Sequence, residues 1–224
     1  MAHTPIHPSQ SDLPEQVWLA SRSPRRKALL ETLGLQVEVF LAQNGPEAEA
    51  LEAPQAGEMP LPYVERVTRL KLHIALQAMM TQGLHGVVLA ADTTVALHNT
   101  ILGKPEDPAH AQRMLTQLSN TAHHVHTAVA VAKLGPHGVI GELALAVQSS
   151  EVTFAPLPAT FIQAYIASGE PFDKAGAYGI QGVAGQYISH ISGSHSGIMG
   201  LPLFETGQLL RHIQSAANQA AHKH

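Results

Sequence analysis

An apolar run that ends in a single carboxylate constrains this chain most: residues 87–91 read VVLAA, Asp92 follows, and apolar residues return at Val95 and Leu97. The run indicates a buried strand, and the later period of two indicates that a strand continues on the far side. We therefore expect Asp92 at the end of a buried strand. A carboxylate there is costly unless a cation, hydrogen bonds or a function holds it, so Asp92 either caps a turn or belongs to a site. Lys104, in a Gly-Lys-Pro turn, is a candidate cation for the same ligand or a solvated lysine.

The composition excludes several classes of protein. The chain has 224 residues, 45% of them hydrophobic and 13% charged, which is typical of a globular protein. It has no cysteine, so disulfides, thiolate metal sites and a cysteine nucleophile are excluded. The net charge of -4 argues against binding to duplex nucleic acid. The chain has no apolar run of the ~20 residues that span a bilayer, and its polar start lacks a signal pattern, so we predict a cytoplasmic protein.

Helical and strand patterns both occur along the chain, and the strands at 124–132 and 139–154 are expected to pair in one sheet. Strands are expected at 17–20, 35–41, 124–132, 139–154 and 186–191, and helices at 24–33, 63–80, 108–118, 158–167 and 201–215. Residues 1–16 are predicted to be a flexible extension, 17–216 a single domain and 217–224 a frayed tail. The acidic segment 42–62 is predicted to be a long loop, a feature that is often functional or mobile.

The first helix begins with a cluster of hydroxyls and arginines. Ser23 suits the N-cap and Pro24 the first helical position. A helix N-terminus offers unpaired N–H groups and partial positive charge, and Arg22, Arg25 and Arg26 beside it would complete a phosphate site. The alternative is an ordinary capped helix with solvated arginines.

Two further segments offer polar groups. Glu52, in the acidic loop, could hold a hard divalent cation together with Asp92, although a solvated loop is the alternative. Lys71 lies on the predicted helix 63–80, near the end that would point toward the cleft. The alternative is that it is a surface lysine. His124 and His126 share one face of a strand but form only a partial metal site, so a structural or solvated role is favoured there.

The late loop 173–182 interleaves small residues with polar and aromatic ones. Gln181 carries both a donor and an acceptor, which suits recognition of a base edge. A purely structural turn is the alternative.

Several separated motifs occur together in a fixed order. They are Leu-Ala-Ser-x-Ser-Pro-Arg-Arg at 19–26, Tyr-Val-x-Arg-Val-x-x-x-Lys at 63–71, Ala-Asp-Thr-x-Val at 91–95, Leu-Gly-Lys-Pro at 102–105, Met-Leu-x-x-Leu-Ser at 114–119, His-x-Val-x-Thr-Ala-Val at 123–129, Glu-Pro-x-Asp-Lys-Ala-Gly-Ala-Tyr-Gly-Ile-Gln-Gly at 170–182 and Gly-Leu-Pro-Leu at 200–203. With this set, the chain resembles the Maf-type nucleotide pyrophosphatases, a family first associated with septum formation, from about residue 17 to 210.

The resemblance implies a mixed α/β fold with an elongated, bent sheet and two lobes around a deep cleft. It implies a nucleotide diphosphatase that cuts a nucleoside triphosphate between its α- and β-phosphates, and a divalent cation, Mg²⁺ or Mn²⁺. Asp92 maps to the catalytic base, although hydroxide on the cation is an alternative activator of water. Lys71 and Lys104 map to the lysines that balance phosphate charge, and Glu52 to the second metal carboxylate, with Glu49 as its rival. Substrate-binding positions map to Ser23, Arg25, Arg26, Thr93 and Gln181.

The late loop implies the branch that acts on dTTP and UTP, because the branch acting on 7-methyl-GTP lacks this glutamine. Arg25, Thr93 and Gln181 are the positions that set this choice in the family. Arg22 departs from the small residue usual in the family. The alternatives are the 7-methyl-GTP branch, a house-cleaning activity on modified nucleotides, and a regulator of septum formation that binds nucleotides without turnover. A homodimer is implied at the level of the family, whereas membrane or stable nucleic-acid binding is not expected.

Overall fold

The computed structural model describes residues 12–42 and 52–221 of the chain. Most of the predicted N-terminal extension, the rival carboxylate Glu49 and the last three residues of the predicted tail lie outside the described residues. The main elements are β1 (Gln16–Leu19), α1 (Pro24–Glu31), β2 (Gln36–Val39), α3 (Pro60–Thr81), β3 (Gly86–Leu97), β4 (Thr100–Leu102), α4 (Pro108–Leu118), β5 (Ala122–Leu134), β6 (Ile140–Phe154), α5 (Ala159–Ala167), β7 (Ile188–Ser192), α6 (His195–Met199) and α7 (Leu203–Ala221).

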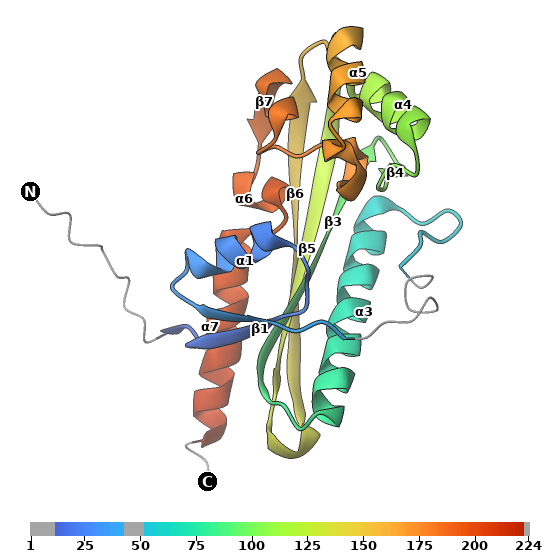
Figure 1. Cartoon of the computed structure of the whole chain (residues 1–224). Coiled ribbons are helices and arrows are strands. Elements are labelled where there is room, and N and C mark those ends of the chain that lie inside the picture. Colours follow the sequence, from blue (N-terminus) through green and yellow to red (C-terminus); the bar gives the residue numbers. More distant parts are fainter. Residues whose placement is uncertain (1–11, 43–51, 222–224) are drawn as a thin grey trace, which may run out of the picture.

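A mixed sheet of seven strands forms the centre of the molecule, in the order β2-β1-β3-β5-β6-β7, with β4 also paired to β3. β1 runs parallel to β2 and β3, and the remaining pairs are antiparallel. The long strands β3, β5 and β6 extend along the whole molecule, which makes the sheet elongated (Figure 1). The mixed α/β class implied by the resemblance is therefore confirmed.

Strand β3 differs from its prediction. It runs without interruption from Gly86 to Leu97, so Asp92 lies in the middle of a strand and not at its end. The reason is the partner strand, because β5 pairs with β3 residue by residue from Gly86 to Ala96 and places Ala128 opposite Asp92. A carboxylate can therefore interrupt the apolar run without ending the strand.

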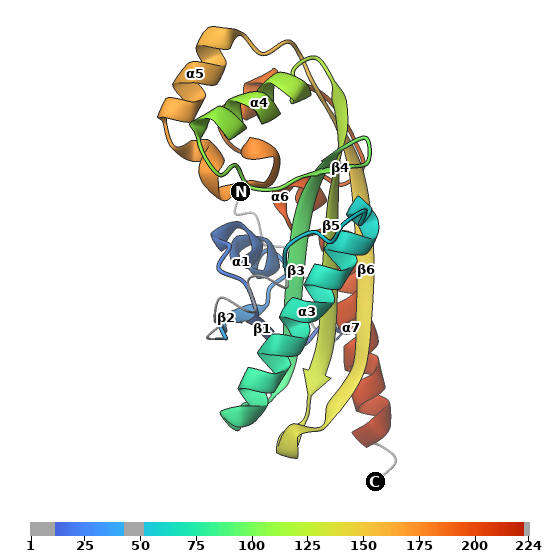
Figure 2. The ribbon, with the colours of Figure 1, turned by 90° about the vertical axis from the view of Figure 1, so that its right-hand side faces the viewer.

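Helices cover the two faces of the sheet in different ways. In the lower part of the molecule as drawn in Figure 1, α3 packs on one face of the sheet through a core cluster that includes Leu72, Leu76 and Met79. There, α1 and α7 pack on the other face through a cluster that includes Leu30 and Leu210. Figure 2 shows the sheet between α3 and α7, with α4 and α5 gathered at the upper end. The upper helices enclose a third core cluster, which joins β3 and β5 to α4 and α5.

Two of these clusters lie on the same face of the sheet. Alternation along β3 puts Ala91, Thr93 and Val95 on one face. Ala91 belongs to the lower cluster and Val95 to the upper cluster, with Thr93 between them. Thr127 pairs with Thr93 on β5, so a row of hydroxyls separates the two apolar cores. This row marks the boundary between two lobes, an upper one that contains α4 and α5 and a lower one that contains α1, α3 and α7.

Most of the predicted elements are present with shifted ends. The bounds of α4 are those predicted, and Ser23 caps α1 by accepting a hydrogen bond from the Arg26 N–H. α3 begins earlier, at Pro60, and α7 continues to Ala221. The short elements β4 and α6 were not predicted. Of the helices in residues 12–42 and 52–221, none combines the length and apolar character that a bilayer span needs.

Candidate active site

A cavity of about 1010 Å³ opens between the two lobes. Its lining includes every site residue that the sequence analysis named within the described part of the chain. These are Ser23, Arg25, Arg26, Glu52, Lys71, Asp92, Thr93, Lys104 and Gln181. Segments that are far apart in the sequence therefore converge on one cavity.

The cavity lies where the sheet has a gap. β1 pairs with β3 as far as Leu89, and β4 pairs with β3 from Val95 onward. Leu89 accepts a hydrogen bond from Ala20 on the β1 side, so the alternating backbone groups of Ala91 and Thr93 face this same edge. The central strand thus presents both side chains and backbone groups to the cavity.

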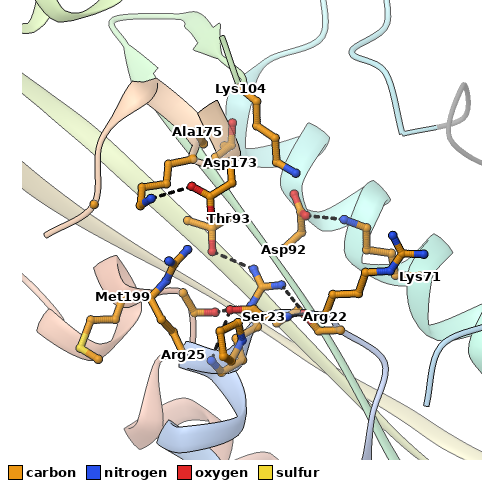
Figure 3. A pocket seen from close by; sticks show the side chains of 18 of the residues that line it. Arg22, Ser23, Arg25, Lys71, Asp92, Thr93, Lys104, Asp173, Ala175 and Met199 are labelled. Atoms are coloured by element: carbon orange, nitrogen blue, oxygen red, sulfur yellow. Dashed lines mark hydrogen bonds and ion pairs between the residues drawn. The ribbon is translucent and has the colours of Figure 1, made fainter. Parts of the chain in front are cut away.

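On one face of β3, a lysine joins two carboxylates. The Lys71 Nζ donates to Asp92 Oδ1 at 2.6 Å and lies 2.9 Å from Glu52 Oε2. Lys71 comes from α3 and Glu52 from the acidic loop before it. The three side chains are 15% to 31% exposed, which leaves them accessible from the cavity. Figure 3 shows Lys71 and Asp92 directed toward each other across the site.

The same two carboxylates fit a divalent cation. Their oxygens already converge on one ammonium group, which shows that they can share a positive charge. Within residues 12–42 and 52–221, no group of three or more His, Asp or Glu side chains is arranged to hold a metal. A donor set of two carboxylates suits Mg²⁺, which commonly takes one or two carboxylates from the protein and the remaining oxygens from phosphates and water.

Arg26 holds three segments together at the start of α1. Its Nε donates to the Gly200 carbonyl at 2.8 Å, its Nη1 to Ser21 Oγ at 3.0 Å and its Nη2 to Thr93 Oγ1 at 3.1 Å. Burial lowers the pKa of Arg26, and the charge of Asp92 opposes this shift. The guanidinium is largely committed to protein partners, so its contribution to a ligand is through charge more than through new hydrogen bonds.

Arg25 and Lys104 differ from Arg26 in their surroundings. Figure 3 shows Lys104 above Asp92 and Arg25 on the α1 side of the same cavity. Within the described part of the chain, neither cation forms an ion pair with a carboxylate. Two cations that line a cavity without such partners suit an anionic ligand with several negative charges.

The late loop closes the upper side of the cavity. Its Gly176 N–H donates to the Gly103 carbonyl at 3.0 Å, which fixes the loop beside the Lys104 turn. Gly176 has φ +66, and an added Cβ would lie 2.8 Å from the Val95 side chain, so only glycine fits. Gln181, at the end of this loop, is exposed and lines the cavity.

Two charged residues of this loop were quoted within a motif but not named as site residues. The Lys174 Nζ donates to Asp173 Oδ1 and to the Glu170 carbonyl, each at 2.6 Å. Burial would raise the pKa of Asp173, but the hydrogen bond and charge of Lys174, with Arg25 contributing, lower it. The adjacent acid and base in the motif were the available signal for this pair.

Tyr63 was also not named, although it lines the cavity beside the two carboxylates. Burial, followed by the charges of Asp92 and Glu52, raises its pKa to about 12. The phenol therefore keeps its proton and adds no charge to the site at neutral pH.

The histidine cluster has a structural arrangement. His123 is buried, and its Nε2 lies 2.6 Å from the hydroxyl of Tyr178, a residue that lines the cavity. Burial lowers the pKa of His123 to about 4, so its ring is neutral. The rings of His124 and His126 stack with centroids 5.7 Å apart, and neither belongs to a metal-binding group among the described residues.

Comparison with known proteins identifies the family. The model of the family described as "Maf-like protein" matches residues 16–213. A dTTP/UTP pyrophosphatase of Albidiferax ferrireducens is 52% identical over 88% of this chain and 96% of its own length. A protein of the same name from a Polaromonas species is 53% identical over 87% of this chain and 94% of its own length. Another, from Cupriavidus metallidurans, is 51% identical over 87% of this chain and 95% of its own length. The chain therefore belongs to the Maf family.

Proposed function

We propose that this protein is a nucleoside triphosphate pyrophosphatase that hydrolyses dTTP and UTP to the monophosphate and pyrophosphate. The observation that carries the proposal is the convergence of Asp92, Lys71, Glu52, Arg25 and Lys104 on one cavity. The dTTP/UTP pyrophosphatases cited above match nearly the whole domain at about half of its positions, which supports the same substrates here.

The charge distribution supports a reaction at phosphorus. A triphosphate brings several negative charges, and Arg25 and Lys104 line the cavity without carboxylate partners of their own among the described residues. We assign them to binding the phosphates, with Ser23 and the start of α1 on the same side. Catalysis of phosphoryl transfer depends mostly on positioning and electrostatic stabilisation, which such a cradle provides.

We assign Asp92 the role of proton acceptor for the attacking water. Its carboxylate is held by Lys71 in the centre of the cavity and is still accessible. Lys71 balances the charges of Asp92 and Glu52 before the substrate binds, and with Lys104 it can balance the charge that develops on the leaving pyrophosphate. A divalent cation held by Asp92 and Glu52 would supply further positive charge to the phosphate oxygens.

We assign recognition of the nucleoside to Gln181 and Thr93, which line the same cavity. Gln181 offers a donor and an acceptor to a pyrimidine edge, and Thr93 offers a hydroxyl. Localisation in the cytoplasm and assembly as a homodimer belong to the same proposal, the homodimer as an expectation from the family. The molar mass in solution, measured by size-exclusion chromatography with light scattering, tests the dimer.

A panel of canonical and modified nucleotides, assayed for pyrophosphate with Mg²⁺ and with Mn²⁺, tests the function. We expect the highest kcat/KM with dTTP and UTP and no turnover without a divalent cation. A preference for 7-methyl-GTP would assign the chain to the other branch, and binding without pyrophosphate release would support the regulator.

A further inference from the structure

A chain of hydrogen bonds runs from α1 across one face of the sheet, over β3 and β5, to α6 next to the cavity. The Arg26 Nη2 donates to Thr93 Oγ1, Thr93 Oγ1 lies 2.9 Å from Thr127 Oγ1, and Thr127 Oγ1 donates to the Gly197 carbonyl at 2.8 Å. Thr127 is fully buried and does not line the cavity, whereas Thr93 lines it. None of the roles proposed above involves Thr127.

The two ends of this chain fix the direction of every proton in it. An arginine can only donate and a carbonyl can only accept. The single hydroxyl proton of Thr127 is used on the Gly197 carbonyl. The proton between the two threonines must therefore come from Thr93, which donates to Thr127.

This direction limits what Thr93 can offer to a ligand. A threonine hydroxyl has one proton and two acceptor positions. The proton is directed to Thr127 on the neighbouring strand, and one acceptor position is used by Arg26. What remains for a ligand is a single acceptor position, so the matching ligand group is a hydrogen-bond donor.

The fold holds this arrangement tightly. An added Cβ on Gly197 would lie 2.5 Å from Gln148 Oε1, so a larger residue there would displace the end of the Gln148 side chain between α6 and the sheet. Gly200 has φ +115, accepts the hydrogen bond from Arg26 Nε and lies beside Thr93 Oγ1. The hydroxyl of Thr93 is thus fixed from three sides before any ligand binds.

We propose that Thr127 is a positioning residue that makes Thr93 a hydrogen-bond acceptor for the nucleoside part of the substrate. The inference rests on the proposed function. The oxygens of a triphosphate bound to a cation are acceptors, so they do not match Thr93. The donors that UTP and dTTP share are the sugar 3′-hydroxyl and the imide N–H of the base, and either would place the nucleoside against β3.

Two analogues of UTP separate these donors. One is 3′-deoxyuridine triphosphate, which lacks the 3′-hydroxyl, and the other is N3-methyluridine triphosphate, which lacks the imide proton. We expect the native protein to hydrolyse one of them with a kcat/KM at least about tenfold below that of UTP, which is the cost of about one hydrogen bond. If both are hydrolysed within about twofold of UTP, the proposal is wrong.

Substitution of Thr127 tests the positioning role. Thr127→Val removes the hydroxyl with little change in shape, so the Thr93 proton no longer has this acceptor. We expect the difference between UTP and the sensitive analogue to fall below about threefold in this variant and to be kept in Thr127→Ser. An equal loss for UTP and for both analogues would indicate a merely structural role and overturn the proposal.

The control is Thr206→Val, which removes another fully buried threonine hydroxyl, in α7, that has no hydrogen-bond partner among the described residues and does not line the cavity. It should leave the discrimination unchanged. Calorimetric binding of UMP and of the corresponding monophosphate analogues repeats the comparison without turnover. A failure of the proposed function would thus appear as the absence of pyrophosphate, and a failure of this inference as the absence of discrimination.

Discussion

Asp92 and Thr93 are neighbours in the chain, yet they lie on opposite faces of β3 and in different environments. On the Asp92 face, a lysine joins two carboxylates that come from separate elements and remain accessible. On the Thr93 face, neutral hydroxyls, an arginine and backbone carbonyls form a directed chain that ends in the buried interior. The difference indicates that the first face carries the reaction, whereas the second holds the two lobes and orients the substrate.

The largest expected effect is on the first face. Asp92→Asn removes the proton acceptor and one cation ligand, so turnover with UTP should fall about 10²- to 10⁴-fold. Lys71 keeps its ion pair with Glu52, so the free energy of unfolding should change by about 1 kcal/mol or less. Urea denaturation and steady-state kinetics on the same preparation measure both quantities. Near-normal turnover would remove Asp92 from the mechanism.

On the second face, that of Thr93, the expected effect of a substitution is a loss of stability. Arg26→Lys keeps the charge but cannot reproduce the three hydrogen bonds that join α1 to Thr93 and Gly200. We expect the free energy of unfolding to fall by about 3 to 4 kcal/mol, since each lost bond leaves a partly buried acceptor without a donor.

Arg25→Lys is the matched control, because Arg25 is adjacent and makes no such bonds among the described residues. It should leave stability within about 0.5 kcal/mol of the native protein while raising KM for UTP. Equal losses of stability in the two variants would contradict the distinction between these arginines.

Acid should weaken the upper core, which lies on the Thr93 face. The pKa of buried His123 is lowered from 6.5 to about 4, so between these values the unfolded chain binds a proton that the folded chain does not. Stability is therefore lost as the pH falls from 6.5 to 4, by up to about 3 kcal/mol.

His123→Gln does not titrate and can still bond the Tyr178 hydroxyl, so its unfolding free energy should depend less on pH over this range. Urea denaturation of both proteins at pH 7 and pH 4.5 measures the difference. Identical pH dependence would show that His123 is not the group responsible.

The smallest expected effect concerns the cation. Glu52→Gln should raise the concentration of Mn²⁺ or Mg²⁺ needed for half-maximal turnover by at least about tenfold, because one charged ligand is lost. Glu65→Gln, on an exposed surface pair with Arg69, is the control. An unchanged metal dependence in Glu52→Gln would show that a different carboxylate supplies the second metal ligand.

Local features of the fold were predictable from the sequence, and features that depend on distant partners were not. The cap of α1 at Ser23 and the bounds of α4 follow from nearby capping and periodicity signals. The continuity of β3 past Asp92 depends on its pairing with β5, which a linear pattern does not show. The five-residue helix α6 is too short to produce a periodic pattern.

The candidate site follows the same rule. Taken singly, Lys71 could be a surface lysine and Glu52 part of a solvated loop. Only the ordered motifs indicated that these residues converge on one site. The Thr127 hydroxyl was not predicted, since its role depends on Thr93, which lies 34 positions away in the sequence, and on a carbonyl 70 positions away.

Hydrolysis of UTP in ¹⁸O-labelled water tests the central claim most directly, because it reports which phosphorus is attacked beside Asp92. We predict that the products are UMP and pyrophosphate and that the label is found in UMP. Label in pyrophosphate or in free phosphate, or the formation of UDP, would contradict the account.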